Sequence, residues 1–85
     1  MTKQIKIIIA EWVQEALEEL GGKAHYVDIA KTIWKNHGKD IENEGDLLFT
    51  WQYDYRWAGT YLRDKGIMLP ANVSAKGIWE LKEDQ

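Results

Sequence analysis

The sequence contains no cysteine, and it has only one proline and one phenylalanine. Without cysteine the chain has no disulfide, no thiol nucleophile and no zinc site built on thiolates. His25 and His37 supply the only imidazole groups, and no second pair of metal ligands stands at helical spacing. No Ser/His/Asp arrangement, phosphate-binding glycine loop or paired-carboxylate cleft is evident. We therefore expect no metal, no cofactor and no enzymatic activity.

Long hydrophobic runs are also missing. No apolar stretch approaches the roughly 18–20 residues that cross a bilayer. The apolar segment 7–10 is too short for a signal peptide, and Glu11 follows it directly. With no cysteine, the composition suits a reducing compartment. We expect a cytoplasmic protein with no membrane contact.

The chain has 85 residues, of which 45 % are hydrophobic and 29 % charged. These values are typical of a folded domain and not of a disordered chain. We expect one domain over residues 1–85, with residues 1–4 and 83–85 frayed. Four of the five tryptophans lie on stripes predicted to be buried, and Trp51 is the less certain one. The four are Trp12, Trp34, Trp57 and Trp79.

Apolar residues recur at helical spacing in three segments. The first covers residues 3–20 and ends at a Gly-Gly pair, which favours the left-handed backbone of a helix end. The second is expected over residues 29–36, capped by Asp28 and ended by His37 and Gly38. The third begins near residue 47 or 50 and ends at residue 65, before Gly66. The acidic segment 39–46 between the last two helices is expected to be a solvated loop.

Short strands are expected between and after these helices. Residues 23–27 are too few for a helix and fit a brief strand. Residues 67–69 and 78–82 are expected to form a hairpin around the turn-rich segment 70–77. Three helices followed by a C-terminal β-hairpin wing are the order of a winged helix-turn-helix, an α+β fold. In nucleic-acid binders of this class, the third helix enters the major groove and the wing reaches the backbone.

The polar side of the third helix supplies candidate DNA contacts. Arg56 and Arg63 are two helical turns apart, and arginine binds guanine bidentately while glutamine binds adenine. Lys76, in the hairpin turn, is a candidate phosphate contact. Gly59 permits either close approach of a DNA groove or tight helix packing, and the whole face could be an ordinary solvated one. The candidate nucleic-acid-binding residues are Gln52, Arg56, Gly59, Thr60, Arg63 and Lys76.

A family resemblance accompanies this pattern. Residues 57–66 read Trp-Ala-Gly-Thr-Tyr-Leu-Arg-Asp-Lys-Gly, and the chain ends with Lys-Gly-Ile-Trp-Glu-Leu at residues 76–81. Together with segments 16–22 and 27–30, they resemble the N-terminal domain of Mrr-type, methylation-dependent restriction endonucleases over about residues 8–82. The resemblance implies a winged helix that binds double-stranded DNA, with restriction of modified DNA as its context. It does not imply cleavage, because the nuclease of that family is a separate domain.

The net charge of −3 is unfavourable for a general polyanion binder. The charge is nevertheless divided along the chain. From Arg56 to Lys82 there are five basic and two acidic residues, a local net charge of +3, so the remainder is strongly acidic. This division favours the third helix and the wing as the nucleic-acid side. We expect a regulatory protein or a recognition module related to restriction systems.

A protein-interaction module on the same fold is the alternative, since function does not follow from fold. Asp54, Asp64 and the acidic balance favour it. The glutamates of the first helix and the acidic segment 39–46 could also mimic DNA for a host-defence or transcription partner. A homodimer through the first helix fits either hypothesis, with Ile7 outside the buried stripe. The first-helix glutamates in question are Glu11, Glu15, Glu18 and Glu19.

Overall fold

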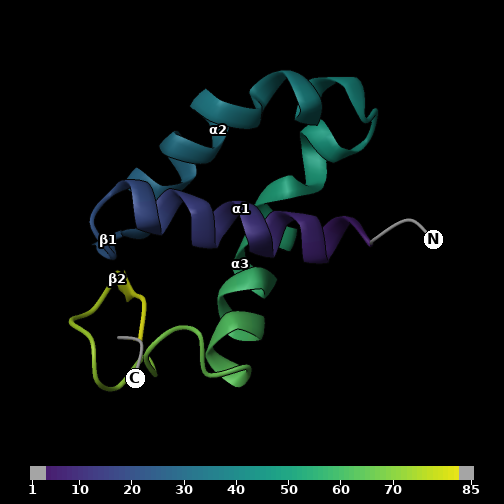
Figure 1. Cartoon of the computed structure of the whole chain (residues 1–85). Coiled ribbons are helices and arrows are strands. Elements are labelled where there is room, and N and C mark those ends of the chain that lie inside the picture. Colours follow the sequence, from purple (N-terminus) through teal and green to yellow (C-terminus); the bar gives the residue numbers. More distant parts are fainter. Residues whose placement is uncertain (1–3, 83–85) are drawn as a thin grey trace.

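The computed structural model describes residues 4–82 as a small α+β domain (Figure 1). Its three helices and two-stranded antiparallel sheet follow the expected order and are compatible with a winged helix. The expected fraying of residues 1–3 and 83–85 lies outside the described residues. Gln4 is not frayed, because its carbonyl accepts hydrogen bonds from Ile7 and Ile8. The elements are α1 (Ile5–Glu19), β1 (Lys23–His25), α2 (Tyr26–Asn43), α3 (Leu47–Asp64) and β2 (Ile78–Glu80).

Helix α1 crosses in front of α3 in Figure 1 and packs against both other helices. Its buried face repeats at helical spacing, as predicted. The helix ends where expected, because Gly21 and Gly22 adopt φ values of 92° and 94°. A residue with a Cβ would be strained at such angles. The buried residues of α1 are Ile9, Ala10, Val13, Ala16 and Leu17.

The prediction for α2 was wrong at both ends. The cap is not Asp28 but His25, whose Nδ1 accepts a hydrogen bond of 3.1 Å from the Val27 N–H. The helix also continues through Gly38, which is buried beneath the Trp34 indole and does not have a positive φ. Burial of Ile41 extends the apolar stripe one turn further. The expected acidic loop 39–46 is therefore mostly helix, and only residues 44–46 form a turn.

Side chains of α1 hold this extended α2 in place. The His37 ring stacks on Trp12 with centroids 4.2 Å apart, and its Nε2 lies 2.8 Å from a Glu15 carboxylate oxygen. His37 is therefore inside a helix and not at a loop edge. The Glu19 carboxylate accepts hydrogen bonds from Lys35 and Asn36, which lower its pKa below the usual value.

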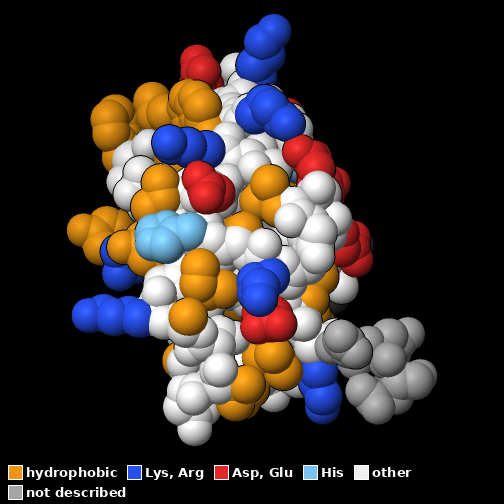
Figure 2. Space-filling view, turned by 90° about the vertical axis from the view of Figure 1, so that its left-hand side faces the viewer, with side chains coloured by type: hydrophobic (Ala, Val, Ile, Leu, Met, Phe, Trp, Pro, Cys, Tyr) orange, Lys and Arg blue, Asp and Glu red, His pale blue; other side chains and the backbone are white. Residues whose placement is uncertain are grey.

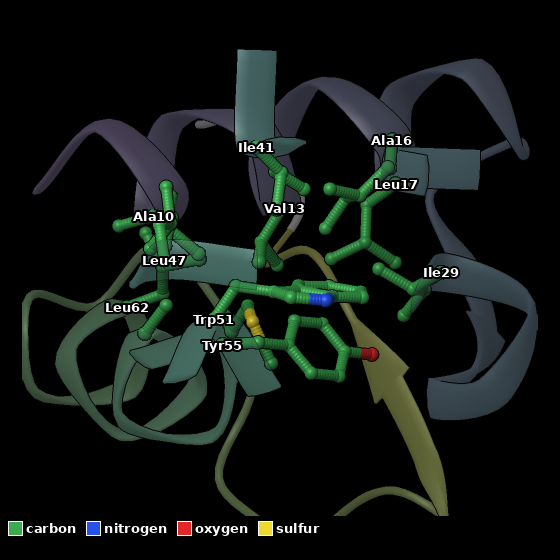
Figure 3. Packing of buried hydrophobic residues seen from close by; sticks show 14 residues of the cluster. Ala10, Val13, Ala16, Leu17, Ile29, Ile41, Leu47, Trp51, Tyr55 and Leu62 are labelled. Carbon is green, nitrogen blue, oxygen red and sulfur yellow. The ribbon is translucent and has the colours of Figure 1, made fainter. Parts of the chain in front are cut away.

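The core centres on α3, and the expected roles of its tryptophans must be corrected. Trp51, the less certain candidate, is only 7 % exposed and lies with Tyr55 beneath Val13 and Leu17 (Figure 3). Trp34 and Trp57 are instead exposed, at 42 % and 36 %. Trp12 and Trp79 are half-buried and pack against the core. Tyr55 takes the buried place expected for Trp57, because it follows Trp51 by one turn on the same face.

The segment 78–82 is paired on both sides. β2 pairs antiparallel with β1, Ala24 facing Trp79. On the other side, Met68 forms a bridge with Leu81, and hydrogen bonds join Leu69 to Glu80 and Lys82 to Ile67. The expected hairpin pairing is therefore present as a bridge, and the brief strand at residues 23–27 is confirmed over Lys23–His25. The turn segment 70–77 projects from this sheet.

Candidate functional site

Three basic side chains meet around a hollow of about 360 Å³ beside the sheet. Two come from α3 and one from the turn segment 70–77, so the hollow depends on how the segment before β2 folds back towards the helix. No acidic residue lines it. The lining residues are Tyr26, Tyr55, Arg56, Arg63, Lys76, Gly77 and Trp79. We call this set the basic hollow.

Aromatic rings support the two guanidinium groups of the basic hollow. The Arg56 Cζ lies 5.9 Å from the Tyr26 ring centroid, and the Arg63 Cζ lies 5.6 Å from the Trp79 ring. Cations are attracted to ring faces at such distances. Within residues 4–82, no carboxylate forms an ion pair with either arginine or with Lys76. The Nε of Arg63 is buried and has no hydrogen-bond partner there. The hollow therefore holds uncompensated positive charge.

The structure distributes the six predicted site residues unequally. It brings Arg56, Arg63 and Lys76 together in the basic hollow. Gln52 and Thr60 are exposed on α3, one turn before and one turn after Arg56. Gly59 is different, because it is buried under Trp79.

A Cβ added at Gly59 would lie 2.8 Å from the Trp79 Cη2 atom and 3.0 Å from its Cζ2. Such contacts are closer than packed carbon atoms allow. Of the two roles open to Gly59, the structure has tight packing, and this residue offers no surface to a DNA groove. It seats β2 and the basic hollow against α3.

Three aromatic residues of the hollow were missed as site residues. Trp79 was assigned to the core, Tyr55 received no role, and Tyr26 was placed in a loop. Tyr55 could have been found from its position four residues after Trp51 on the buried stripe. Tyr26 could not, because its place in the hollow depends on α2 starting three residues earlier than expected. Its ring also stacks on His25, with centroids 4.5 Å apart.

Tyr55 joins the hollow to the core. Its hydroxyl donates a hydrogen bond to the backbone carbonyl of Tyr26. Burial raises the pKa of this hydroxyl well above its ordinary value, an effect that the nearby Arg56 charge only partly opposes. The neutral, hydrogen-bonded form is therefore the one that the fold stabilises.

We expect the domain to lose stability as the pH rises above about 10, because there the unfolded chain releases the Tyr55 proton and the folded chain retains it. The unfolding free energy should fall by up to about 1.4 kcal/mol per pH unit from this group. Urea unfolding between pH about 8 and about 11 measures the slope, which Tyr55→Phe should reduce. The exposed Tyr53→Phe is the matched control and should keep the wild-type slope. An unchanged slope in Tyr55→Phe would contradict this assignment.

Other classes of site find no support in the part of the chain that is described. Over residues 4–82, no three His, Asp or Glu side chains are grouped so that they could hold a metal ion. None of the described helices is both long enough and apolar enough to cross a membrane.

Comparison with known proteins adds no relative. No protein-family model, curated protein or solved structure matches the chain. Since one fold serves many functions, the function must be inferred from the basic hollow and its surroundings.

Proposed function

We propose that this chain is a non-enzymatic winged-helix domain that binds double-stranded DNA. Helix α3 lies in the major groove, and the turn segment 70–77 acts as the wing on the sugar-phosphate backbone. The observation that carries the proposal is the basic hollow: two arginines and a lysine from separate segments converge, and no acid lines the cavity. The resemblance of residues 57–66 to Mrr-type N-terminal domains supports the same function.

The contacts divide into two kinds. Arg63 and Lys76 bind phosphate oxygens, because they lie beside β2 and the wing and carry charge that no neighbouring carboxylate neutralises. Gln52, Arg56 and Thr60 face outward at four-residue intervals on α3, the spacing of one helix face. Arginine and glutamine bond the major-groove edges of guanine and adenine. These three residues are the base-reading set.

The overall acidity of the chain does not oppose this assignment. Glu15 and Glu19 lie on α1 and interact with side chains of α2, away from the basic hollow. Asp54 is half-buried and does not line the hollow. The excess of acidic residues is therefore found mainly outside the proposed DNA face, where it limits non-specific binding to other polyanions.

Titration of a fluorescent duplex tests the proposal. With about three phosphates neutralised, raising the salt concentration from about 50 to about 200 mM should weaken binding about 40-fold, because bound counterions are released on association. Fluorescence anisotropy measures both affinities, and a protein unfolded in urea serves as the control. No binding near 50 mM salt, or an affinity that does not change with salt, would refute DNA binding.

A further inference from the structure

A second cavity lies between α2 and the first half of α3, on the other side of Tyr26 and Arg56 from the basic hollow. Its volume is about 570 Å³, and seven of its ten lining residues are aromatic or aliphatic. We propose that this α2–α3 groove binds an acidic amphipathic helix of a partner protein. The lining residues are Tyr26, Val27, Ala30, Lys31, Trp34, Leu48, Trp51, Gln52, Tyr55 and Arg56.

Much apolar surface in and beside the groove is left uncovered. Trp34 is 42 % and Leu48 38 % exposed, and the Trp34 and Trp51 rings lie near one another with centroids 6.2 Å apart. Beyond the groove, Phe49 and Tyr53 of α3 are each 78 % exposed. In Figure 2, hydrophobic side chains gather at the upper left, with Lys and Arg side chains beside them. Contiguous exposed apolar surface marks interaction sites.

The size and composition of this surface favour a protein. Tryptophan, tyrosine and arginine are the residues that dominate binding energy in protein interfaces. An open groove between two helices accepts the apolar face of a third helix. A DNA strand is a poor occupant, because the floor is formed by Trp51 and Tyr55, which are nearly buried and offer no cation to a phosphate.

Charge complementarity makes the partner acidic. Lys31 and Arg56 are the charged residues of the groove, and no carboxylate lines it. A helix with glutamates or aspartates beside its apolar anchors would therefore pair with both cations. Asp28 and Asp54, the acids nearest in the sequence, are absent from the lining.

A second copy of this chain does not supply such a helix. The acidic helix of the chain is α1, and its apolar stripe is buried in the core of its own domain. Two of its glutamates are also engaged: Glu15 lies against His37, and Glu19 accepts hydrogen bonds from Lys35 and Asn36. The occupant is therefore a segment of another protein.

The groove and the basic hollow can be tested separately. Lys31, Trp34 and Leu48 lie in the groove and do not line the hollow, whereas Arg63 and Lys76 line only the hollow. Variants of the first group should leave duplex affinity unchanged. This inference therefore stands even if the domain does not bind DNA.

The test uses two synthetic amphipathic helical peptides. Both carry leucine and phenylalanine on one face; one has glutamates flanking that face, and the other has lysine at each of these positions. We expect the acidic peptide to bind at least about tenfold more tightly, since the lysine peptide places like charges against Lys31 and Arg56. Isothermal titration calorimetry gives the affinities, and indole N–H shifts of Trp34 and Trp51 locate the peptide.

Variants of α2 and α3 complete the experiment. Lys31→Glu and Leu48→Ser should each weaken the acidic peptide about tenfold, as expected for residues that contact it. Lys39→Glu makes the same charge change on the exposed surface of α2 outside the groove and should have no effect. The proposal is overturned if neither peptide binds at millimolar concentration, if both bind equally, or if Lys39→Glu is as damaging as Lys31→Glu. Self-association of the free chain that Leu48→Ser abolishes would identify a second copy as the occupant and also overturn it.

Discussion

Replacing Gly59 with valine is expected to lower the free energy of unfolding by about 2–3 kcal/mol, within the upper range for overpacked interiors. The first added carbon already lies 2.8 Å from Trp79, and valine adds two methyl groups beyond it. Trp79 cannot easily move aside, because its ring also contacts Tyr55 at a centroid distance of 4.9 Å and lies beneath Arg63. Urea unfolding followed by circular dichroism at 222 nm measures the change.

Two further variants isolate the contact between Gly59 and Trp79. Thr60→Val introduces the same side chain at the next, exposed position of α3 and should change stability by less than about 0.5 kcal/mol. Trp79→Phe makes room, so Gly59→Val should cost less in that background than in the wild type. If Gly59→Val is as stable as the wild type, β2 does not pack on α3 as described, and the basic hollow loses its support.

Removing the two proposed phosphate contacts together is expected to weaken duplex binding about 100-fold, if each contributes about 1.4 kcal/mol. The variant is Arg63→Ala/Lys76→Ala, which leaves Arg56 and the groove intact. The slope of log affinity against log salt should also become shallower by about two, because two fewer counterions are released. Anisotropy titrations at several salt concentrations measure both quantities.

Lys35→Ala/Lys39→Ala is the matched control, because it removes the same charge from the exposed surface of α2. Its effect should be small, since neither lysine lines the basic hollow. Equal losses in the two double variants would mean that DNA responds only to net charge. Retention of wild-type affinity by Arg63→Ala/Lys76→Ala would remove the phosphate contacts from the proposal.

The order of elements was predictable because each helix carries a local apolar repeat and a glycine that ends it. The left-handed glycines after α1 and α3 are local features of this kind, and they lie where expected. The extension of α2 was not predictable in the same way. It depends on contacts of His37 with Trp12 and Glu15, which are far away in the sequence, and on Trp34 covering Gly38.

The candidate site was predictable in its charges but not in its shape. Arg56 and Arg63 share a face of α3 by helical spacing alone, whereas Lys76 joins them only because β2 pairs with β1 and places the wing beside α3. Gly59 left two roles open, and the Trp79 ring that decides between them comes from another strand. The apolar groove was also unforeseen, since Trp34 was assigned to the core and its exposure depends on how α2 and α3 diverge.

Indole N–H signals during a duplex titration, recorded by NMR with ¹⁵N-labelled protein, test the central claim most directly. The five tryptophans are spread over the domain, so each reports on a different surface. DNA binding in the basic hollow predicts that the signals of Trp79 and of the Gly77 amide shift, while Trp12, packed against His37, does not. If Trp79 and Gly77 remain unchanged at saturating duplex, DNA does not bind at this site, and the account is contradicted.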